Sequence, residues 1–376
     1  MKKSLRSAIS LLLAIFFTFS FAVNVGAKEI VNTLNTFPDY PIVASKVQEM
    51  LPSIYSEPIT KNDRVSIGNQ IPTYYVDNNN VITVSEYASY PVFVNGILVS
   101  IADVTKNADG KISQVSLGTD YAVALQKFLS VNGNEPFAIF FAYDGVYLKF
   151  EESEYISCIK PYSDIPLNSA TLSIFNNTNT TNVKYSALSS VGSIQIGANT
   201  QKISPASANT VLFDYLNVTN VKNASTSCCP GGICWAACIA MMANYYRGTS
   251  YSALQVHNIC GCLTSNYHNE EKSYIRKMGM HAGGPYYSTG SLAFSFSTLY
   301  DCIEGNTLLL LDLQATGVAH NVVAYGYYAN GNSLYFYIMD PNTGVKLLSF
   351  PSSSGSPVRI SLSGHNYQVH CYITAY

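Results

Sequence analysis

The sequence predicts an α+β fold, because strand pairs and helical runs occupy separate stretches of the chain. Apolar runs flank an Asn-Gly pair at 95–96 and an Asp-Gly pair at 144–145, which is typical of β-hairpins. An Ala-rich run with apolar residues at helical spacing covers 234–247. A third hairpin is predicted around the Asn-Gly pair at 330–331. These patterns favour antiparallel strand pairs combined with helices.

The N-terminal stretch has the three parts of a secretory signal peptide. Basic residues at positions 2, 3 and 6 precede an apolar run at 8–23, and small residues end at Ala27. We expect cleavage after Ala27, with Ala22 as the alternative. The apolar run is short for a membrane span, and no later stretch approaches about eighteen unbroken apolar residues. The mature protein, from residue 28 onward, is therefore expected to be secreted, soluble and without a membrane span.

The composition excludes partners that are recognised by charge alone. The chain carries 21 Lys and Arg against 23 Asp and Glu, and charged residues make up only 12% of the total. No basic field favours nucleic acid, and no block of Lys and Arg favours anionic lipid. We therefore expect no nucleic-acid partner. We also expect the protein to be a monomer.

The mature chain, roughly 350 residues long, is expected to form two domains. The first, 28–222, contains the two early hairpins and a helix over 119–131. Asn, Thr and Ser dominate 175–193, which predicts an exposed linker or loop. The second domain, 223–376, holds eight of the nine cysteines and the histidines. This change of composition places the boundary near residue 223.

The cysteine spacing argues against a metal site. Cys228-Cys229 and the Cys-Gly-Cys run at 260–262 are not the two-residue-spaced pairs typical of zinc ligands. We therefore expect no metal and no cofactor. An odd number of cysteines leaves at least one thiol outside any disulfide. The others are expected to be buried thiols or disulfides, whose pairing the spacing leaves open.

Cys234 is the candidate nucleophile. It falls in the first turn of the predicted helix 234–247, directly after the Pro-Gly-Gly run at 230–232. The positive end of the helix dipole and unpaired backbone N–H groups both stabilise a thiolate there. The small glycines allow a substrate backbone to approach, and an N–H group can face a developing oxyanion. The alternative is a buried helix cysteine, which describes Cys238 well.

A thiolate nucleophile needs a base and a group that orients the base. The run 317–344 reads as strand, turn and strand, with His320 entering the first strand. Asp340 and Asn342 follow the second strand. A two-residue loop sets Pro341 opposite His320, a three-residue loop sets Asp340 there, and a longer loop sets Asn342. Asp340 is the chemically productive partner, because a carboxylate orients the imidazole and stabilises its cation.

These segments together resemble the papain-like cysteine peptidases. The run Gly-Ile-Cys-Trp-Ala-Ala at 232–237 is similar to their nucleophile segment, and 321–327 after His320 is similar to their histidine strand. The run Asp-Pro-Asn-Thr-Gly at 340–344 is similar to the segment that supplies the third residue. The short interval from cysteine to histidine resembles compact bacterial members, such as the staphopains and plant-pathogen effector peptidases. The resemblance covers residues 223–376.

The resemblance implies a two-lobed catalytic domain, with a helical lobe and an antiparallel β-sheet lobe, preceded by an α+β pro-domain. Cys234 would attack the peptide carbonyl, His320 would transfer protons and Asp340 would orient His320. Protein or peptide substrates are implied. Residues 28–222 would act as an intramolecular inhibitor until they are removed near 214–227. A permanent partner domain is the alternative for this region.

One position departs from the family pattern. The family carries a Gln six residues before the nucleophile as an oxyanion donor, whereas Cys228 stands there in this chain. Losing such a donor costs on the order of 100-fold in rate. Two other functions therefore stay open at this point. One is a Cys-His amidase or acyltransferase acting on cell-wall peptides, and the other is a non-catalytic secreted binding protein on a peptidase-like fold.

Overall fold

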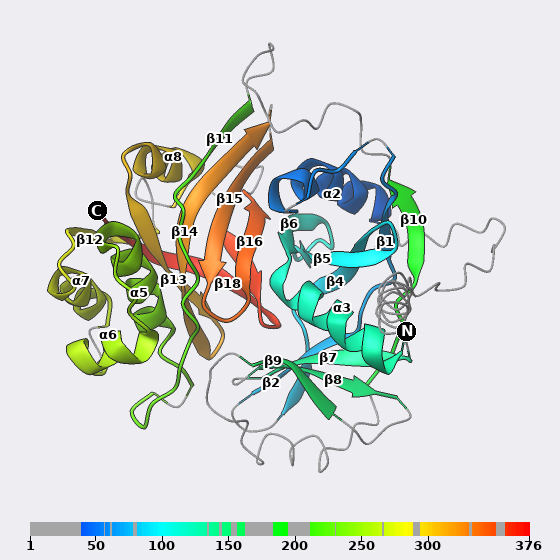
Figure 1. Cartoon of the computed structure of the whole chain (residues 1–376), viewed down its shortest axis with the longest axis horizontal. Coiled ribbons are helices and arrows are strands. Elements are labelled where there is room, and N and C mark those ends of the chain that lie inside the picture. Colours follow the sequence, from blue (N-terminus) through cyan, green and yellow to red (C-terminus); the bar gives the residue numbers. More distant parts are fainter. Residues whose placement is uncertain are drawn as a thin grey trace, which may run out of the picture. The chain divides into compact units, whose positions relative to one another are not determined.

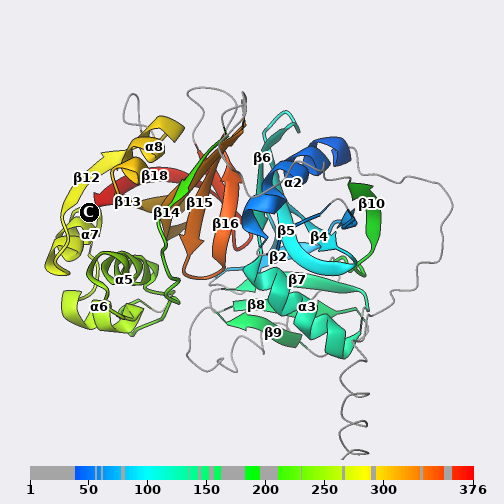
Figure 2. The ribbon, with the colours of Figure 1, turned by 45° about the horizontal axis from the view of Figure 1, so that its top comes forward.

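The protein is described from a computed structural model (Figures 1 and 2). The structure describes residues 39–376 except positions 56, 61, 78–80, 134, 143–144, 152–155, 162–182, 195–210, 230, 265–266, 289–293, 331–332 and 351–357. The predicted signal peptide lies outside the described residues. None of the described helices combines the length and hydropathy needed to traverse a bilayer.

Two sheets form the framework of the described chain. The strands of the larger sheet are β1 (Val65–Gly68), β4 (Ala88–Val94), β5 (Ile97–Lys106), β6 (Ile112–Gly118), β10 (Ser190–Ile194), β11 (Val211–Tyr215), β12 (Ala282–Tyr287), β13 (Leu308–Ala315), β14 (Val318–Asn330), β15 (Ser333–Asp340), β16 (Gly344–Ser349), β17 (Arg359–Leu362) and β18 (His365–Ala375). They lie in the order β10-β1-β4-β5-β6-β16-β15-β14-β13-β18-β12, with β11 beside β14 and β17 beside β18. The smaller sheet has the order β3 (Ile82–Val84), β2 (Thr73–Val76), β7 (Phe137–Ala142), β8 (Gly145–Phe150) and β9 (Ile156–Pro161).

The predicted α+β class is confirmed. Among the described strand pairs, only β2 and β7 run parallel. The described helices are α2 (Tyr40–Ile54), α3 (Asp120–Asn132), α5 (Cys234–Arg247), α6 (Ala253–Cys260), α7 (Tyr267–Lys277) and α8 (Phe296–Glu304). The helix predicted over 119–131 is α3, and the helix predicted over 234–247 is α5.

The position of α5 follows from the residues of β13. Leu308 and Leu310 are buried in the same cluster as the apolar face of α5, whereas Leu309 and Leu311 are buried with α8. Alternate side chains of a strand point to opposite faces, so an unbroken apolar run marks a strand that is covered on both faces. Figure 2 shows α8 and α5 on either side of β13 and β14. This packing fixes the helix whose first residue is Cys234.

Both hairpins predicted in the first half are confirmed. β4 and β5 join through Asn95 and Gly96, whose positive φ angles of 53° and 81° are those that a type I′ turn requires. β7 and β8 pair up to Ala142 and Gly145, on either side of 143–144.

The linker predicted over 175–193 is partly wrong. Residues 175–182 lie outside the described residues, but the run from Ser190 to Ser193 belongs to β10 and pairs with β1. Backbone hydrogen bonds from a distant strand order a segment whose own composition predicts a loop. Such tertiary pairing is invisible in local composition.

The larger sheet crosses the boundary predicted near residue 223. β6 pairs with β16, and Leu117 lies opposite Leu347. Beside this junction the buried Lys346 donates a hydrogen bond of 2.6 Å to Asp103. The first and second halves of the chain therefore share hydrogen bonds and a buried ion pair.

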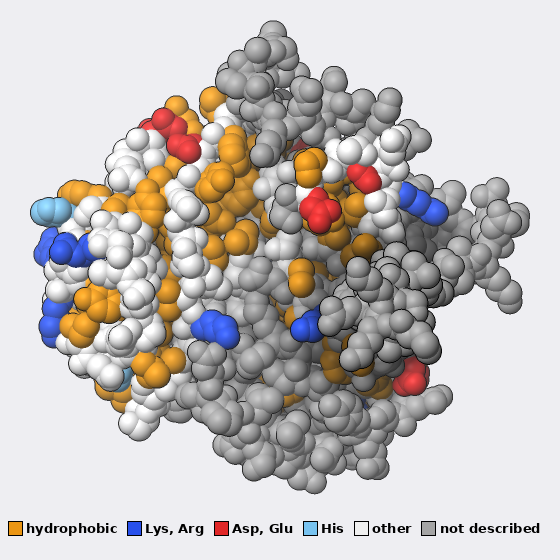
Figure 3. All heavy atoms as spheres, in the orientation of Figure 1, with side chains coloured by type: hydrophobic (Ala, Val, Ile, Leu, Met, Phe, Trp, Pro, Cys, Tyr) orange, Lys and Arg blue, Asp and Glu red, His pale blue; other side chains and the backbone are white. Residues whose placement is uncertain are grey.

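β11 precedes the predicted boundary and pairs along β14 from Val211 to Tyr215. Figure 3 shows apolar side chains gathered over these two strands. Leu212, Phe213 and Tyr215 of β11 remain between 40% and 50% exposed. The strand is held chiefly by its backbone pairing, because much of its apolar surface faces solvent.

Candidate active site

Cys234 is the first residue of α5, as predicted. The N–H groups of Ala236 and Ala237 both donate to the carbonyl of Ile233, which starts the helix. No described residue accepts a hydrogen bond from the backbone N–H of Cys234 or Trp235. Unpaired N–H groups at a helix N-terminus form an anion-binding site. The half-buried Cys234 side chain therefore lies beside donors that can bind an oxyanion.

The loop before Cys234 depends on Gly232. Its φ of +117° is a conformation that L side chains rarely adopt, and an added Cβ would lie 2.5 Å from the amide nitrogen of Asn223. Asn223 in turn donates through Nδ2 to Oδ1 of Asn342, at 3.0 Å. The nucleophile loop is thus fastened to the turn that follows β15, which carries Asp340.

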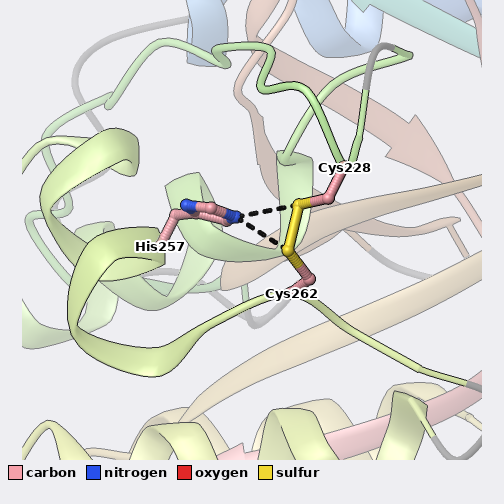
Figure 4. A group of neighbouring side chains, drawn as sticks. All are labelled: Cys228, His257 and Cys262. Atoms are coloured by element: carbon pink, nitrogen blue, oxygen red, sulfur yellow. Dashed lines mark hydrogen bonds between the residues drawn. A yellow bond between two sulfur atoms is a disulfide. The ribbon is translucent and has the colours of Figure 1, made fainter.

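A disulfide between Cys228 and Cys262 holds the same loop against the end of α6. Figure 4 shows the imidazole of His257 facing both sulfur atoms, with Nε2 3.3 Å from Cys228 Sγ and 3.5 Å from Cys262 Sγ. Cys228 occupies the position of the family's glutamine donor. Because its sulfur is bonded to Cys262, this side chain has no N–H or O–H group to offer an oxyanion.

His320 and Asp340 are in direct contact. Nε2 of His320 lies 2.7 Å from Oδ1 of Asp340, and both side chains are buried. The Cys234 sulfur is close enough to interact electrostatically with His320 and to raise the pKa of its imidazole. Since Asp340 occupies Nε2, the ring nitrogen that remains for the sulfur is Nδ1. The structure therefore brings together all three residues that the sequence indicated.

The register that sets Asp340 directly opposite His320 is wrong. Asn330 pairs with Ser333, so the strands close around 331–332, and an irregularity between Ala324 and Gly326 then shifts the pairing by one residue. This pairing lies one position later along both strands than a two-residue Asn-Gly turn would give. Extended to the strand ends, the resulting register sets Asn342 opposite His320.

Asp340 nevertheless binds His320, because the turn after β15 directs its carboxylate toward the ring. Asp340 pairs with Gly344 across this turn. Its carboxylate accepts hydrogen bonds from the N–H groups of Asn342 and Thr343 and from the Thr343 hydroxyl. The Asn342 side chain binds Asn223 instead. Asp340 is therefore the described partner of His320, and Asn342 supports Asp340 through its backbone.

The electrostatics favour a charged His320. Burial by itself would lower the pKa of the imidazole, but the Asp340 carboxylate and the Cys234 sulfur raise this pKa to about 10. Burial would raise the pKa of Asp340, yet His320 and the donors of Thr343 and Asn342 hold it below its usual range. An imidazolium between a carboxylate and a sulfur is the resting state typical of a cysteine nucleophile with a histidine partner.

Two further polar residues near Cys234 were not predicted. Asn321 lies with Oδ1 3.7 Å from the Cys234 sulfur. Glu271 of α7 is 1% exposed, and burial followed by the nearby charges of Asp312 and Cys234 raises its pKa well above the usual range. Asn321 directly follows His320, which is a local signal. Glu271 sits in a polar helix with no such signal.

The remaining cysteine of the predicted helix is structural. Cys238 is fully buried, and burial raises the pKa of its thiol. Donor side chains also converge at one other buried place, where His268, Asp312 and Cys371 lie together.

These features define a site of the cysteine peptidase type, and the family comparison agrees. A family model described as papain-like cysteine protease AvrRpt2 matches residues 216–353. The match supports a papain-like cysteine peptidase family for this part of the chain, as the resemblance predicted, and the matched residues include Cys234, His320 and Asp340. Comparison with curated proteins finds no match.

Proposed function

We propose that the protein is a secreted cysteine endopeptidase, made as a zymogen, that hydrolyses peptide bonds through Cys234, His320 and Asp340. The observation that supports it is the arrangement of three side chains. His320 Nε2 lies 2.7 Å from the buried Asp340 carboxylate, the next residue, Asn321, contacts the Cys234 sulfur at the start of α5, and that sulfur raises the pKa of His320. The family match to residues 216–353 supports the same reaction class.

The proposed reaction has two stages. The Cys234 thiolate attacks the substrate carbonyl, and the oxygen that becomes negative is bound by backbone N–H groups at the start of α5. The His320 imidazolium then donates its proton to the leaving amine, which gives an acyl-enzyme and a neutral imidazole. That imidazole takes a proton from water as the water oxygen attacks the thioester carbonyl. The bond from this carbon to the Cys234 sulfur then breaks, which releases the acid product and restores the Cys234 thiolate beside the His320 imidazolium.

Asp340 contributes throughout this cycle. Its contact with Nε2 leaves Nδ1 as the nitrogen that faces the sulfur, and its charge stabilises the cation that the first stage requires. Three donors from Asn342 and Thr343 keep the carboxylate ionised and fixed. The turn after β15 is therefore a positioning element for His320.

We propose that residues 28–222 form a pro-region that restrains the catalytic part. A chain of ring contacts extends from this region toward the site. The ring centroids of Tyr75 and His365 lie 4.2 Å apart, and the His365 ring contacts that of Tyr367. The ring centroids of Tyr367 and His320 lie 6.0 Å apart. The continuous pairing of β6 with β16 favours an additional outcome, in which the cleaved pro-region stays bound. Loss of the pro-region would expose the backbone edge of β16 and the buried Lys346.

The position of cleavage is expected within 214–227, as the sequence predicts. Asn223 and Ala224 are buried there, and Ala224 accepts a hydrogen bond from the N–H of Ile233. Cleavage before Asn223 would leave both anchors of the nucleophile loop on the catalytic fragment. We therefore place the processed bond upstream of Asn223.

The test is to express residues 28–376 as wild type and as Cys234→Ala, and to follow the chain length on incubation. We expect the wild type to lose its first domain and the variant to remain intact. Equal shortening of both would assign the cleavage to another enzyme. Turnover of casein rather than of cell-wall muropeptides then separates an endopeptidase from a Cys-His amidase.

A further inference from the structure

A second cluster of reactive side chains lies in the interior of the second half of the chain. It joins three elements: His268 comes from α7, Asp312 from β13 and Cys371 from β18. The strand register sets Asp312 and Cys371 opposite each other, which explains how residues far apart in sequence meet. None of the three belongs to the proposed catalytic group.

The cluster is closed to solvent and its donor atoms converge. His268 is 7% exposed, Asp312 2% and Cys371 0%. One ligand atom from each lies within 4.8 Å of the others, and Nε2 of His268 is 2.7 Å from Oδ2 of Asp312. A fourth group, the carboxyl of Glu271, interacts electrostatically with both Asp312 and Cys371.

Two buried carboxylate oxygens, one in this cluster and one on the neighbouring Glu271, have no hydrogen-bond partner among the described residues. They are Oδ1 of Asp312 and Oε2 of Glu271, whose side chains are almost completely buried. An unsatisfied polar atom in the interior costs about 1–3 kcal/mol, and more when it is charged. A cation bound beside Asp312 would give its carboxylate the missing partner.

We propose that His268, Asp312, Cys371 and Glu271 bind one divalent transition-metal ion, for which zinc is the best match. One nitrogen, one sulfur and two oxygens make a four-coordinate donor set that suits zinc, and the absence of an exposed position among these residues is typical of a structural site. Calcium and magnesium prefer oxygen ligands alone.

The separations between ligand atoms that such a site requires can be compared with those of His268, Asp312 and Cys371. In a tetrahedral zinc site, metal–ligand bonds of about 2.0–2.3 Å set neighbouring ligand atoms about 3.3–3.8 Å apart. The ligand atoms of His268, Asp312 and Cys371, which lie within 4.8 Å of one another, would therefore adjust around the ion, and the 2.7 Å contact between His268 and Asp312 would open to about 3.3 Å. The Glu271 carboxyl lies outside this group and would turn toward the ion to complete the four ligands.

The outer contact of His268 fits the role of a ligand. Its other ring nitrogen, Nδ1, lies 3.4 Å from the hydroxyl of Tyr287 on β12. A histidine that binds metal through one nitrogen commonly donates the other N–H to a neighbouring acceptor, which fixes the tautomer and the ring orientation. The hydroxyl oxygen of Tyr287 can accept that hydrogen bond.

The site would fasten α7 to the centre of the sheet beside the nucleophile. Glu271 neighbours Asn321, and Asn321 contacts the Cys234 sulfur. A metal that holds Glu271 would thus stabilise one wall of the proposed active site. The site itself does not require Cys234 chemistry, so it can be tested in an inactive protein.

The experiment uses residues 28–376 carrying Cys234→Ala, which removes the catalytic thiol as a competing ligand. The purified protein is analysed for metals, stripped with a chelator and titrated with cobalt(II). We expect one cobalt per chain, visible bands of tetrahedral intensity and a near-ultraviolet sulfur-to-cobalt band. Zinc addition should displace the cobalt and raise the melting temperature.

Matched variants locate the ion. Cys371→Ser should abolish the sulfur-to-cobalt band, and Glu271→Gln, which preserves side-chain size, should weaken binding by at least about tenfold. Cys302→Ser removes another partly buried thiol and should leave the spectrum unchanged. His257→Ala tests the disulfide group of Figure 4 and should also leave it unchanged.

Three outcomes would overturn the proposal. The first is that the folded parent protein binds no cobalt. The second is that Glu271→Gln and Cys371→Ser both bind cobalt as the parent does, and the third is that His257→Ala no longer binds cobalt. If Cys371→Ser does not fold, the sulfur-to-cobalt band of the parent and the Glu271→Gln titration still decide the matter. Peptidase activity plays no part in these readouts, so failure here leaves the proposed function untouched.

Discussion

Replacing Asp340 with Asn isolates the electrostatic contribution of the carboxylate to His320. The exchange keeps the size of the side chain and an oxygen acceptor for Nε2, but it removes the negative charge that raises the pKa of His320. That pKa, about 10, lies about 3.5 units above the ordinary value of 6.5. At 1.36 kcal/mol per unit, the net preference for the imidazolium is on the order of 5 kcal/mol.

Asp340 is the largest of the groups that raise this pKa, ahead of Cys234. An opposite charge at contact distance shifts a pKa by about 1–3 units. We therefore expect Asp340→Asn to move the alkaline limb of the pH–rate profile down by about 1–3 pH units. We also expect kcat/KM at pH 7 to fall on the order of 10²–10⁴-fold, because the neutral ring is a poorer proton donor and is less firmly oriented.

The assay is the pH dependence of kcat/KM on a fluorogenic protein substrate, with circular dichroism to confirm folding at each pH. Asn342→Ala is the matched control, because its side chain binds Asn223 and not His320. This control should retain the alkaline limb of the wild type. The prediction is wrong if Asp340→Asn leaves the pH position of the alkaline limb unchanged and keeps kcat/KM within about threefold of the wild type. It is also wrong if only Asn342→Ala moves the alkaline limb.

Three other predictions follow from the same contacts. Gly232→Ala should unfold the nucleophile loop or lower the free energy of unfolding by about 1–3 kcal/mol, because the new Cβ clashes with Asn223 and the φ of +117° strains an alanine. Urea unfolding measures this change, and an unchanged midpoint contradicts the prediction. Lys346→Met should lower the free energy of unfolding by about 3–5 kcal/mol, because it leaves Asp103 buried without its cation. Calorimetry measures this change, and adding Asp103→Asn to the same chain should recover part of the lost stability. The raised pKa of His320 should stabilise the fold fully below pH 6.5, the pKa in the unfolded chain, and this contribution should disappear between pH 6.5 and about pH 10. The free energies of unfolding of wild type and His320→Gln, measured in urea at each pH, should converge over that range. A constant difference between the two would disprove the prediction.

The sequence could predict the position of Cys234 at the start of a helix because its signals are local. An Ala-rich helix, a glycine-containing loop before it and a following Cys-Trp-Ala run are all adjacent to Cys234. The hairpins around 95–96 and 144–145 were predictable for the same reason, since turn residues and flanking strands are close neighbours in the chain.

The contact of His320 with Asp340 was predicted through a register that the structure does not have. Asn330 pairs with Ser333, and the irregularity between Ala324 and Gly326 shifts the strands again. Asp340 reaches His320 because the next turn, after β15, supplies three donors that aim its carboxylate. Strand irregularities and side-chain direction at a turn depend on tertiary contacts, which hydrophobic alternation does not encode.

The cluster of His268, Asp312 and Cys371 could not be predicted from spacing. Cysteine spacing reveals metal sites whose ligands lie in short loops, whereas these ligands come from one helix and two strands that are separated along the chain. Glu271 and Asn321 were missed for a related reason. Their importance comes from burial beside the proposed site and from no motif of their own.

The most direct test of the central claim is the rate at which Cys234 is alkylated at acidic pH. Wild-type and His320→Ala proteins are treated with iodoacetamide at pH 5.5, and each modified cysteine is quantified by peptide mass spectrometry. Cys229 and Cys260, two other partly exposed thiols, serve as internal standards. We expect Cys234 to react far faster than both standards in the wild type and to lose this advantage in His320→Ala. Equal rates for all three cysteines in the folded wild type would contradict this expectation.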